Sequence, residues 1–182
     1  MSETVVGIDQ SLTETGIVVI TDGVLISSAV IKPGTRRGIV RLMYVEEELS
    51  KAIPIVADLI VMEGYAFNPR AGQSFSLGEL GGIVKRLAYT KKKLLISIAP
   101  GTLKKYVTGD GSAKKNVMLL GAFKKFGITC TNDNECDAYC LARIGSEFLK
   151  AEAPGGSVPA AFKPIHKAIL KYNDWTDGGN HE

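Results

Sequence analysis

Short apolar runs rich in valine and isoleucine alternate with longer amphipathic stretches along this 182-residue chain. The short runs predict five β-strands, which cover residues 4–10, 15–21, 24–31, 58–63 and 94–98. Asp22-Gly23 lies between the second and third runs and predicts a hairpin turn, because both residues tolerate positive φ. The fourth run is apolar throughout, which is typical of a strand at the centre of a sheet.

The longer stretches repeat apolar residues every three or four positions and predict α-helices. These helices cover residues 38–53, 74–90, 101–107, 113–126 and 135–150. Strands that alternate with helices after an opening antiparallel meander predict an α/β fold, a five-stranded mixed sheet with helices on both faces. In the first helix, the residues expected on the buried side are Val40, Met43, Tyr44 and Leu49.

The helix expected at 74–90 contains Gly78, Gly81 and Gly82. Each glycine in a helix interior costs roughly 1 kcal/mol relative to alanine, so several in one helix predict close packing against another backbone. Small residues also let helices of two subunits approach closely. This helix is therefore the best candidate for a two-fold interface.

The length fits one compact domain with a tail. We expect a domain over residues 1–150, followed by a tail over 151–182 that opens with a linker rich in proline and glycine. Apolar residues in the tail predict a short helix. The last residues, 178–182, are expected to be disordered.

The composition says more about where the protein is located in the cell than about its binding partner. The formal net charge is only +3, but the basic residues fall in local clusters that can bind phosphate. No apolar run is long enough to span a bilayer, and the first residues form a strand rather than a basic leader, so we expect a cytoplasmic protein. The cysteines are odd in number, which favours reduced thiols, and their spacing with no nearby histidine argues against a zinc site. They are Cys130, Cys136 and Cys140.

Three acidic residues stand at the ends of predicted elements. Asp9 closes the first strand, Glu63 closes the fourth, and Asp137 lies at the start of the helix at 135–150. Carboxylates that converge at one sheet edge repel one another unless a hard cation lies between them. Mg²⁺ takes oxygen ligands and retains waters for a phosphate substrate, so this pattern indicates a metal-dependent nuclease. A strand-terminal Asp can also simply cap its own turn.

The residues that precede Asp137 offer further ligands. Asn134 is three positions from Asp137 and shares its helix face, so both can contact one ion, whereas Glu135 points away. Both Asp133 and Asn134 are also good helix caps. We expect Asp133 to cap the helix and Asn134 to contact metal or water.

Two other segments predict contacts with nucleic acid. Residues 100–115 combine a Gly-x-Gly turn and a helix start with Lys104, Lys105, Lys114 and Lys115, and backbone N–H groups at a helix start attract phosphate. The turn is not a P-loop, because no Gly-Lys-Ser/Thr follows it. The loop after Glu63 carries aromatic and basic side chains suited to DNA, namely Tyr65, Phe67 and Arg70.

Together these segments resemble the RuvC family of Holliday-junction resolvases, within the RNase H-like fold. The resemblance spans about residues 4–148, and the sequence around Asp137 is more similar to that of the phage-encoded branch. The matching pieces occur in the family's order, and they are Gly7-Ile8-Asp9 with Gly16, Glu63, the segment from Lys104 to Lys115, and Asp137-Ala138.

The resemblance implies a homodimer that binds four-way DNA and nicks one strand per subunit with two Mg²⁺ or Mn²⁺ ions, leaving 5′-phosphate and 3′-hydroxyl ends. It implies Asp9, Glu63 and Asp137 as metal ligands with Asn134 as the fourth. Lys104 and Lys115 would lie near the scissile phosphate, with Lys115 assisting catalysis. The family's base-stacking phenylalanine falls at Ala66 here, so Tyr65 or Phe67 would replace it.

The chain departs from the family's pattern at two further positions, and three other functions stay open. Bacterial members usually have proline at the position of Gln10. They often have aspartate at the position of Asn134, and because asparagine is uncharged, the second ion would bind more weakly here. The alternatives are a branched-DNA binding protein without cleavage, and an RNase H-like nuclease acting on RNA–DNA hybrids or flaps. An actin-like kinase or ATPase ranks last, because the chain is too short to enclose a nucleotide.

Overall fold

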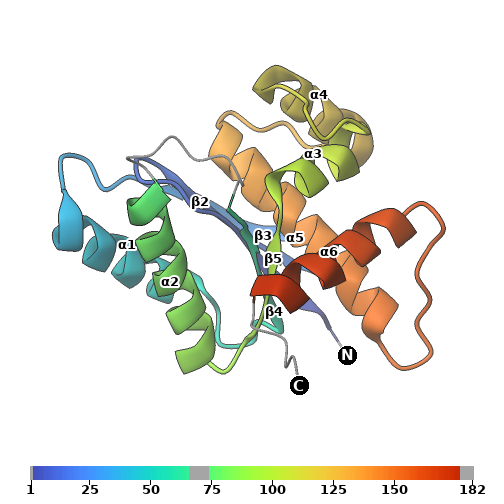
Figure 1. Ribbon diagram of the computed structural model, residues 1–182, viewed down its shortest axis with the longest axis horizontal. Coiled ribbons are helices and arrows are strands. Elements are labelled where there is room, and N and C mark those ends of the chain that lie inside the picture. The colour runs from blue at the N-terminus through green and yellow to red at the C-terminus, as the bar shows by residue number, and fades with distance from the viewer. Residues whose placement is uncertain (1, 66–73, 177–182) are drawn as a thin grey trace.

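The computed structural model describes residues 2–65 and 74–176, and it is an α/β fold built on one sheet (Figure 1). The strands are β1 (Thr4–Asp9), β2 (Thr15–Thr21), β3 (Val24–Ile31), β4 (Leu59–Glu63) and β5 (Leu94–Ile98). The helices are α1 (Gly38–Ala52), α2 (Ser74–Thr90), α3 (Pro100–Thr108), α4 (Lys115–Phe126), α5 (Asp133–Glu152) and α6 (Lys163–Thr176).

The sheet has the order β3-β2-β1-β4-β5 and mixes two kinds of pairing. β1, β2 and β3 are antiparallel, as expected of strands joined by tight turns, whereas β1, β4 and β5 are parallel. The turn between β2 and β3 contains the predicted pair Asp22-Gly23, and both residues have positive φ. The fully apolar strand β4 lies inside the sheet, where both of its faces are covered.

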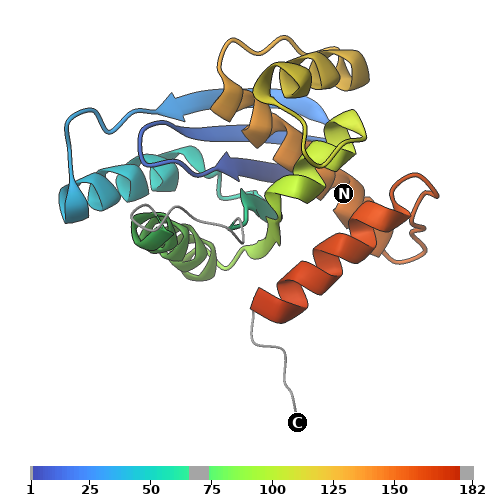
Figure 2. The same cartoon turned by 45° about the horizontal axis from the view of Figure 1, so that its top comes forward.

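Alternation along the strands divides the interior into two layers. Val6 and Ile8 of β1 face the layer beneath α1 and α2, whereas Val5 faces the layer that contains α3, α4, α5 and α6. Figures 1 and 2 show these two groups of helices on opposite sides of the sheet. The prediction of a five-stranded mixed sheet with helices on both faces is confirmed.

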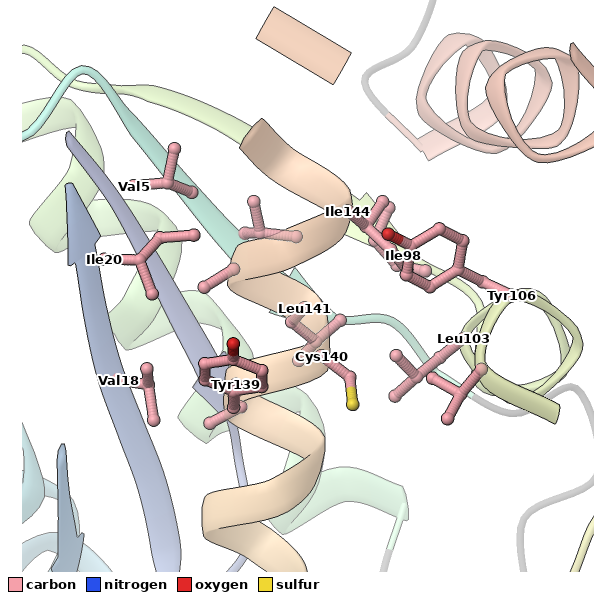
Figure 3. Packing of buried hydrophobic residues seen from close by; sticks show 14 of the residues in the cluster. Val5, Val18, Ile20, Ile98, Leu103, Tyr106, Tyr139, Cys140, Leu141 and Ile144 are labelled. Atoms are coloured by element: carbon pink, nitrogen blue, oxygen red, sulfur yellow. The ribbon is translucent and has the colours of Figure 1, made fainter. Parts of the chain in front are cut away.

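Helix α5 lies directly against the sheet because two strand positions have no side chain (Figure 3). A Cβ atom built on Gly7 would lie 1.9 Å from the carbonyl oxygen of Ala138. A Cβ atom on Gly16 would lie 2.1 Å from the carbonyl oxygen of Asn134. The first turns of α5 are therefore in backbone contact with β1 and β2, and this contact fixes where Asp137 lies.

The predicted buried side of the first helix was partly wrong. Leu42, Val45 and Leu49 are buried, whereas Val40 and Met43 are exposed. This helix carries apolar residues around most of its circumference, so spacing alone allowed more than one buried side. The sheet selects one of them and leaves an exposed apolar surface on α1.

The glycines of α2 meet no backbone among the described residues of their own chain, so the close packing that they predict stays a prediction for a second copy. Around Gly78 and Gly82, the space that a Cβ atom would enter contains no atom within 4 Å. Gly81 instead makes room for a side chain, because its Cβ atom would lie 2.0 Å from the hydroxyl of Tyr65. Among the described residues, no backbone packs against these glycines.

The tail contains the predicted helix, α6, which lies against the layer of α3 and α5. Phe162, Ile165 and Ile169 are buried in that layer's apolar core. The expectation of disorder for 178–182 concerns residues outside the described part of the chain. Within that part, no helix is long and apolar enough to cross a membrane.

Candidate active site

Strand register brings the first two carboxyl groups together. Ile8 of β1 pairs with Met62 of the parallel strand β4, so the next residues, Asp9 and Glu63, are neighbours at the carboxyl ends of both strands. Ile8 and Met62 face α1 and α2. Alternation therefore directs Asp9 and Glu63 to the other face of the sheet, toward α5. Asp9 is only 6% exposed.

Helix α5 supplies the third carboxyl group. Gly16 pairs with Asp9 across β1 and β2, and α5 passes over Gly16 at Asn134 and over Gly7 at Ala138. Asp137 lies between these two contacts. Its carboxylate is near enough to Asp9 and Glu63 to raise the pKa of both.

Burial and mutual repulsion perturb all three groups in the same direction. Burial, with the charges of Glu63 and Asp137, raises the pKa of Asp9 well above its ordinary value. Burial, followed by the charge of Asp137, raises the pKa of Glu63 to about 7. Burial, followed by the charge of Asp133, raises the pKa of Asp137 to about 6. A hydrogen bond between Asp9 and Glu63 favours the proton on Asp9, because it raises the pKa of Asp9 and lowers that of Glu63.

These shifts predict the pH dependence of metal-free stability. Glu63 has an unfolded-state pKa of 4.5 and a folded-state pKa of about 7, so its stabilising contribution is complete below 4.5 and is lost as the pH rises through 7. In metal-free buffer at pH 8, Glu63→Gln should therefore raise the melting temperature, by roughly 2–4 °C if it contributes about 1 kcal/mol. The gain should vanish near pH 4.5. Calorimetry at both pH values measures it, with the exposed Glu79→Gln as a control that should show no such gain.

The donor chemistry of this group fits a hard divalent cation. Three carboxyl groups with raised pKa values, one buried and two half-buried, supply only oxygen ligands, which suit Mg²⁺ or Mn²⁺. Without a cation, Asp9 and Glu63 share a hydrogen bond instead. In residues 2–65 and 74–176, no three His, Cys, Asp or Glu side chains are already arranged around one ion position. A cation would therefore have to replace the shared proton and draw these carboxylates together.

A cavity of about 520 Å³ opens beside Glu63 and Asp137, and three lysines are among its other lining residues. Lys104 comes from α3, and Lys114 and Lys115 come from the start of α4. Lys104 acts on the carboxylates directly, since its charge lowers the pKa of both Glu63 and Asp137. The cavity thus places an acidic cluster against ammonium groups, which suits a phosphate bridged by metal.

The start of α5 differs from the prediction in one respect. The cap is Asn132, whose side-chain oxygen accepts from the backbone N–H of Asn134 at 2.8 Å and of Glu135 at 3.3 Å. The prediction that Asp133 caps the helix was wrong, because Asp133 forms an ion pair with Lys115 and lines the cavity. Asn134 is half-buried at the contact with Gly16.

Two residues that the sequence reasoning did not assign to the site help to build it. Gln10 is buried, and its side-chain amide donates to the backbone carbonyl of Glu63 at 3.0 Å, so it connects the ends of β1 and β4. Asn132 donates to Glu14 at 2.8 Å in addition to capping α5. An asparagine before a helix is a capping signal, but the helix was predicted to start at 135 and starts at Asp133, so the signal at Asn132 lay outside the predicted helix end.

The remaining predicted DNA contacts are dispersed. Tyr65 is partly exposed, and its hydroxyl donates to the carbonyl of Gly78 at 3.4 Å, which holds the ring against α2. Lys105 is exposed and lines a different cavity, between α3 and α6. Phe67 and Arg70 lie outside the described residues, as does Ala66.

The cysteines are free, as the sequence predicted. Cys136 and Cys140 are buried on α5, and Cys130 is half-buried before it.

Several solved structures that are similar to this one are Holliday junction resolvases. Thermus thermophilus RuvC in complex with a Holliday junction substrate has a TM-score of 0.67 at 18% identity, over 77% of this chain and 90% of that chain. The fowlpox virus Holliday junction resolvase has a TM-score of 0.51 at 11% identity, over 79% of this chain and 98% of that one. The yeast mitochondrial Holliday junction resolvase Ydc2 has a TM-score of 0.50 at 11% identity, over 96% and 83%.

At the level of sequence, no protein-family model matches the chain and no curated protein does. Identities this low establish architecture rather than activity. What the matches share with this chain is its overall architecture, the five-stranded mixed sheet with helices on both faces. This chain has the RNase H-like fold of RuvC and other Holliday junction resolvases.

Proposed function

We propose that this protein is a metal-dependent endonuclease that cuts four-way or other branched DNA. The observation that carries the proposal is the convergence of Asp9, Glu63 and Asp137 beside a cavity lined by lysines. Buried carboxyl groups with raised pKa values are costly to maintain and are concentrated at functional sites. The likeness in fold to Holliday junction resolvases supports branched DNA as the substrate.

In this proposal, Asp9, Glu63 and Asp137 hold two Mg²⁺ or Mn²⁺ ions, with Asn134 as a fourth, uncharged ligand. When bound there, such ions would supply activation of a water molecule and stabilisation of the leaving 3′ oxygen, so the expected products carry 5′-phosphate and 3′-hydroxyl ends. Lys104 offsets negative charge that develops on the phosphoryl oxygens. Lys115 is held by Asp133 at the same cavity and takes the same role once a phosphate competes for it.

The test compares three labelled substrates: a four-way junction, a linear duplex of matched sequence, and an RNA–DNA hybrid. Each is incubated with and without Mg²⁺. Cutting of the junction alone, at paired positions and only with Mg²⁺, is the expected result. Cutting of the hybrid instead would assign the site to an RNase H-like activity, and binding of the junction without cutting, with Mg²⁺ present, would refute the nuclease.

We further propose that the active form is a homodimer paired through α2. Gly78 and Gly82 are four residues apart on one open face of this helix, and Phe75 and Tyr89 are exposed apolar side chains on it. The neighbouring α1 adds exposed apolar residues of its own. A two-fold pair presents two identical sites to the two strands of a symmetric junction.

Gly82→Trp should therefore yield monomers that no longer make paired cuts, because the indole would fill the space between the two helices. Sedimentation velocity at micromolar concentration measures the state of association. Lys167→Trp, on the exposed side of α6, is the matched bulky control and should remain dimeric. Gly81 is unsuitable for this test, since a side chain there would collide with Tyr65 within the same subunit. A wild-type protein that sediments as a monomer with and without DNA would contradict the pairing.

A further inference from the structure

Helix α4 presents an apolar face to solvent. Val117 is 43% exposed, Leu120 52% and Phe123 55%. These residues are three positions apart and share one side of the helix, which we call the α4 face. The opposite side of α4 packs into the core through Met118 and Ala122. The exposure therefore does not arise from a helix that lacks a buried side.

The charges around the α4 face favour binding of an anion over pairing with the α4 face of a second copy. Lys124 lies on it, one turn after Leu120, and Lys114 is exposed at the start of the helix. Residues 111–128 contain no acidic residue. Two copies of the α4 face brought together would set lysine against lysine, so self-association through it is disfavoured. A polyanion that also offers apolar surface satisfies both the lysines and the apolar side chains.

The α4 face begins at the edge of the candidate active site. Leu119 lines the cavity together with Glu63 and Asp137, and Phe123 is one helical turn beyond Leu119 on the adjoining side. Figures 1 and 2 both show α4 at the outer edge of the molecule, beyond α3 and on the opposite side of the sheet from α1 and α2. A strand held at the cavity would reach the α4 face next.

We propose that Val117, Leu120 and Phe123 bind bases that are unstacked at the branch point of the DNA, and so select branched DNA over a continuous duplex. A continuous duplex keeps its bases stacked and offers mainly phosphate outside its grooves, which the lysines alone would recognise. At a branch, base faces are exposed, and aromatic and aliphatic side chains can cover them. The proposal rests on the proposed function, because it specifies how the same site recognises its substrate.

The experiment measures binding without cutting, in buffer that contains EDTA. The probes are a four-way junction with 2-aminopurine beside the branch and a linear duplex of the same sequence. For wild type we expect a rise in 2-aminopurine fluorescence on the junction, since unstacking relieves quenching. Leu120→Ser and Phe123→Ser should each lose that rise and lower junction affinity about tenfold. Their affinity for the duplex and the salt dependence of binding should not change, and Phe123→Tyr should restore the fluorescence.

Lys124→Ala is the matched control on the same face. It should weaken binding to both DNAs and reduce the salt slope by roughly one counterion, while the fluorescence rise persists. Equal losses on junction and duplex for Phe123→Ser, or no loss on either, would overturn the proposal. Wild-type oligomers that Leu120→Ser converts to monomers would also overturn it, by assigning the α4 face to a second copy.

The outcome is separable from that of the nuclease itself. Asp137→Asn should keep the full fluorescence response although it cannot cut. If the wild type cuts no DNA but shows a branch-specific fluorescence response that Phe123→Ser removes, the nuclease proposal fails and the proposal for the α4 face is supported. If the wild type cuts junctions while Phe123→Ser binds and responds as the wild type does, the nuclease proposal is supported and the proposal for the α4 face fails.

Discussion

Asp137→Asn is expected to reduce cleavage of a four-way junction by at least about 10²–10³-fold while leaving junction binding nearly intact. The substitution keeps the size of the side chain but removes one of the three carboxylates of the acidic cluster. Affinity should survive, because contacts with phosphates elsewhere supply most of it. Single-turnover cleavage and gel-shift titration, both in Mg²⁺, measure the two quantities. Asp9→Asn and Glu63→Gln should behave in the same way.

The matched control is Glu135→Gln, two residues away on the same helix. Glu135 is also acidic, but its carboxylate accepts a hydrogen bond from Ser28 at 2.5 Å and does not line the cavity. Loss of its charge should leave the cleavage rate within a few-fold of wild type. Full activity of Asp137→Asn, or an equal loss for Glu135→Gln, would remove Asp137 from the catalytic group and leave a general electrostatic effect in its place.

Gly7→Ala should destabilise the protein by about 3 kcal/mol or more, although it adds only one methyl group. The new Cβ atom would lie 1.9 Å from the carbonyl oxygen of Ala138, and backbone cannot rotate away as a flexible side chain can. Gly16→Ala should act similarly through Asn134. Urea denaturation monitored by circular dichroism gives the free energy of unfolding of each variant.

Gly78→Ala should have the opposite effect on the free energy of unfolding. This position is helical and open, so alanine should stabilise α2 by up to about 1 kcal/mol. If Gly7→Ala folds with wild-type stability, α5 has room to move away from β1, and the spacing of Asp9 and Asp137 does not depend on this contact. A stable Gly7→Ala variant with lost cleavage would instead show that α5 had shifted and carried Asp137 with it.

The sequence predicted those features that depend on one segment at a time. Apolar runs placed all five strands to within one or two residues, and Asp9 and Glu63 stood at strand ends as expected. Their convergence depends on the pairing of Ile8 with Met62, and it was expected because parallel strands bring their carboxyl ends to the same edge of a sheet. The side of α1 that is buried was not predictable, because its apolar residues surround the helix.

Features that depend on two segments were missed for a common reason. Asn132 and Asp133 cap helices about equally well, and only the nearby Lys115 draws Asp133 away from that role. Gly81 of α2 was expected to meet a backbone, but within the chain the side chains of Tyr65 and Gln10 lie in the space beside it. Gln10 could not be linked to Glu63 without the neighbouring ends of β1 and β4. Each depends on a partner distant along the chain.

The backbone contact between α5 and the sheet also divides the site into two parts with different freedom to evolve. The acidic part is carried by elements in direct main-chain contact, so the distance between Asp9 and Asp137 can change only if the whole helix is displaced. The basic part is carried by α3 and α4, which pack on each other and on α5 and contribute side chains to the shared apolar core that substitution can reshape. Substitutions that change which DNA is bound should therefore accumulate on α3 and α4. The positions of the acidic residues should stay the same even when most of the surrounding sequence has changed.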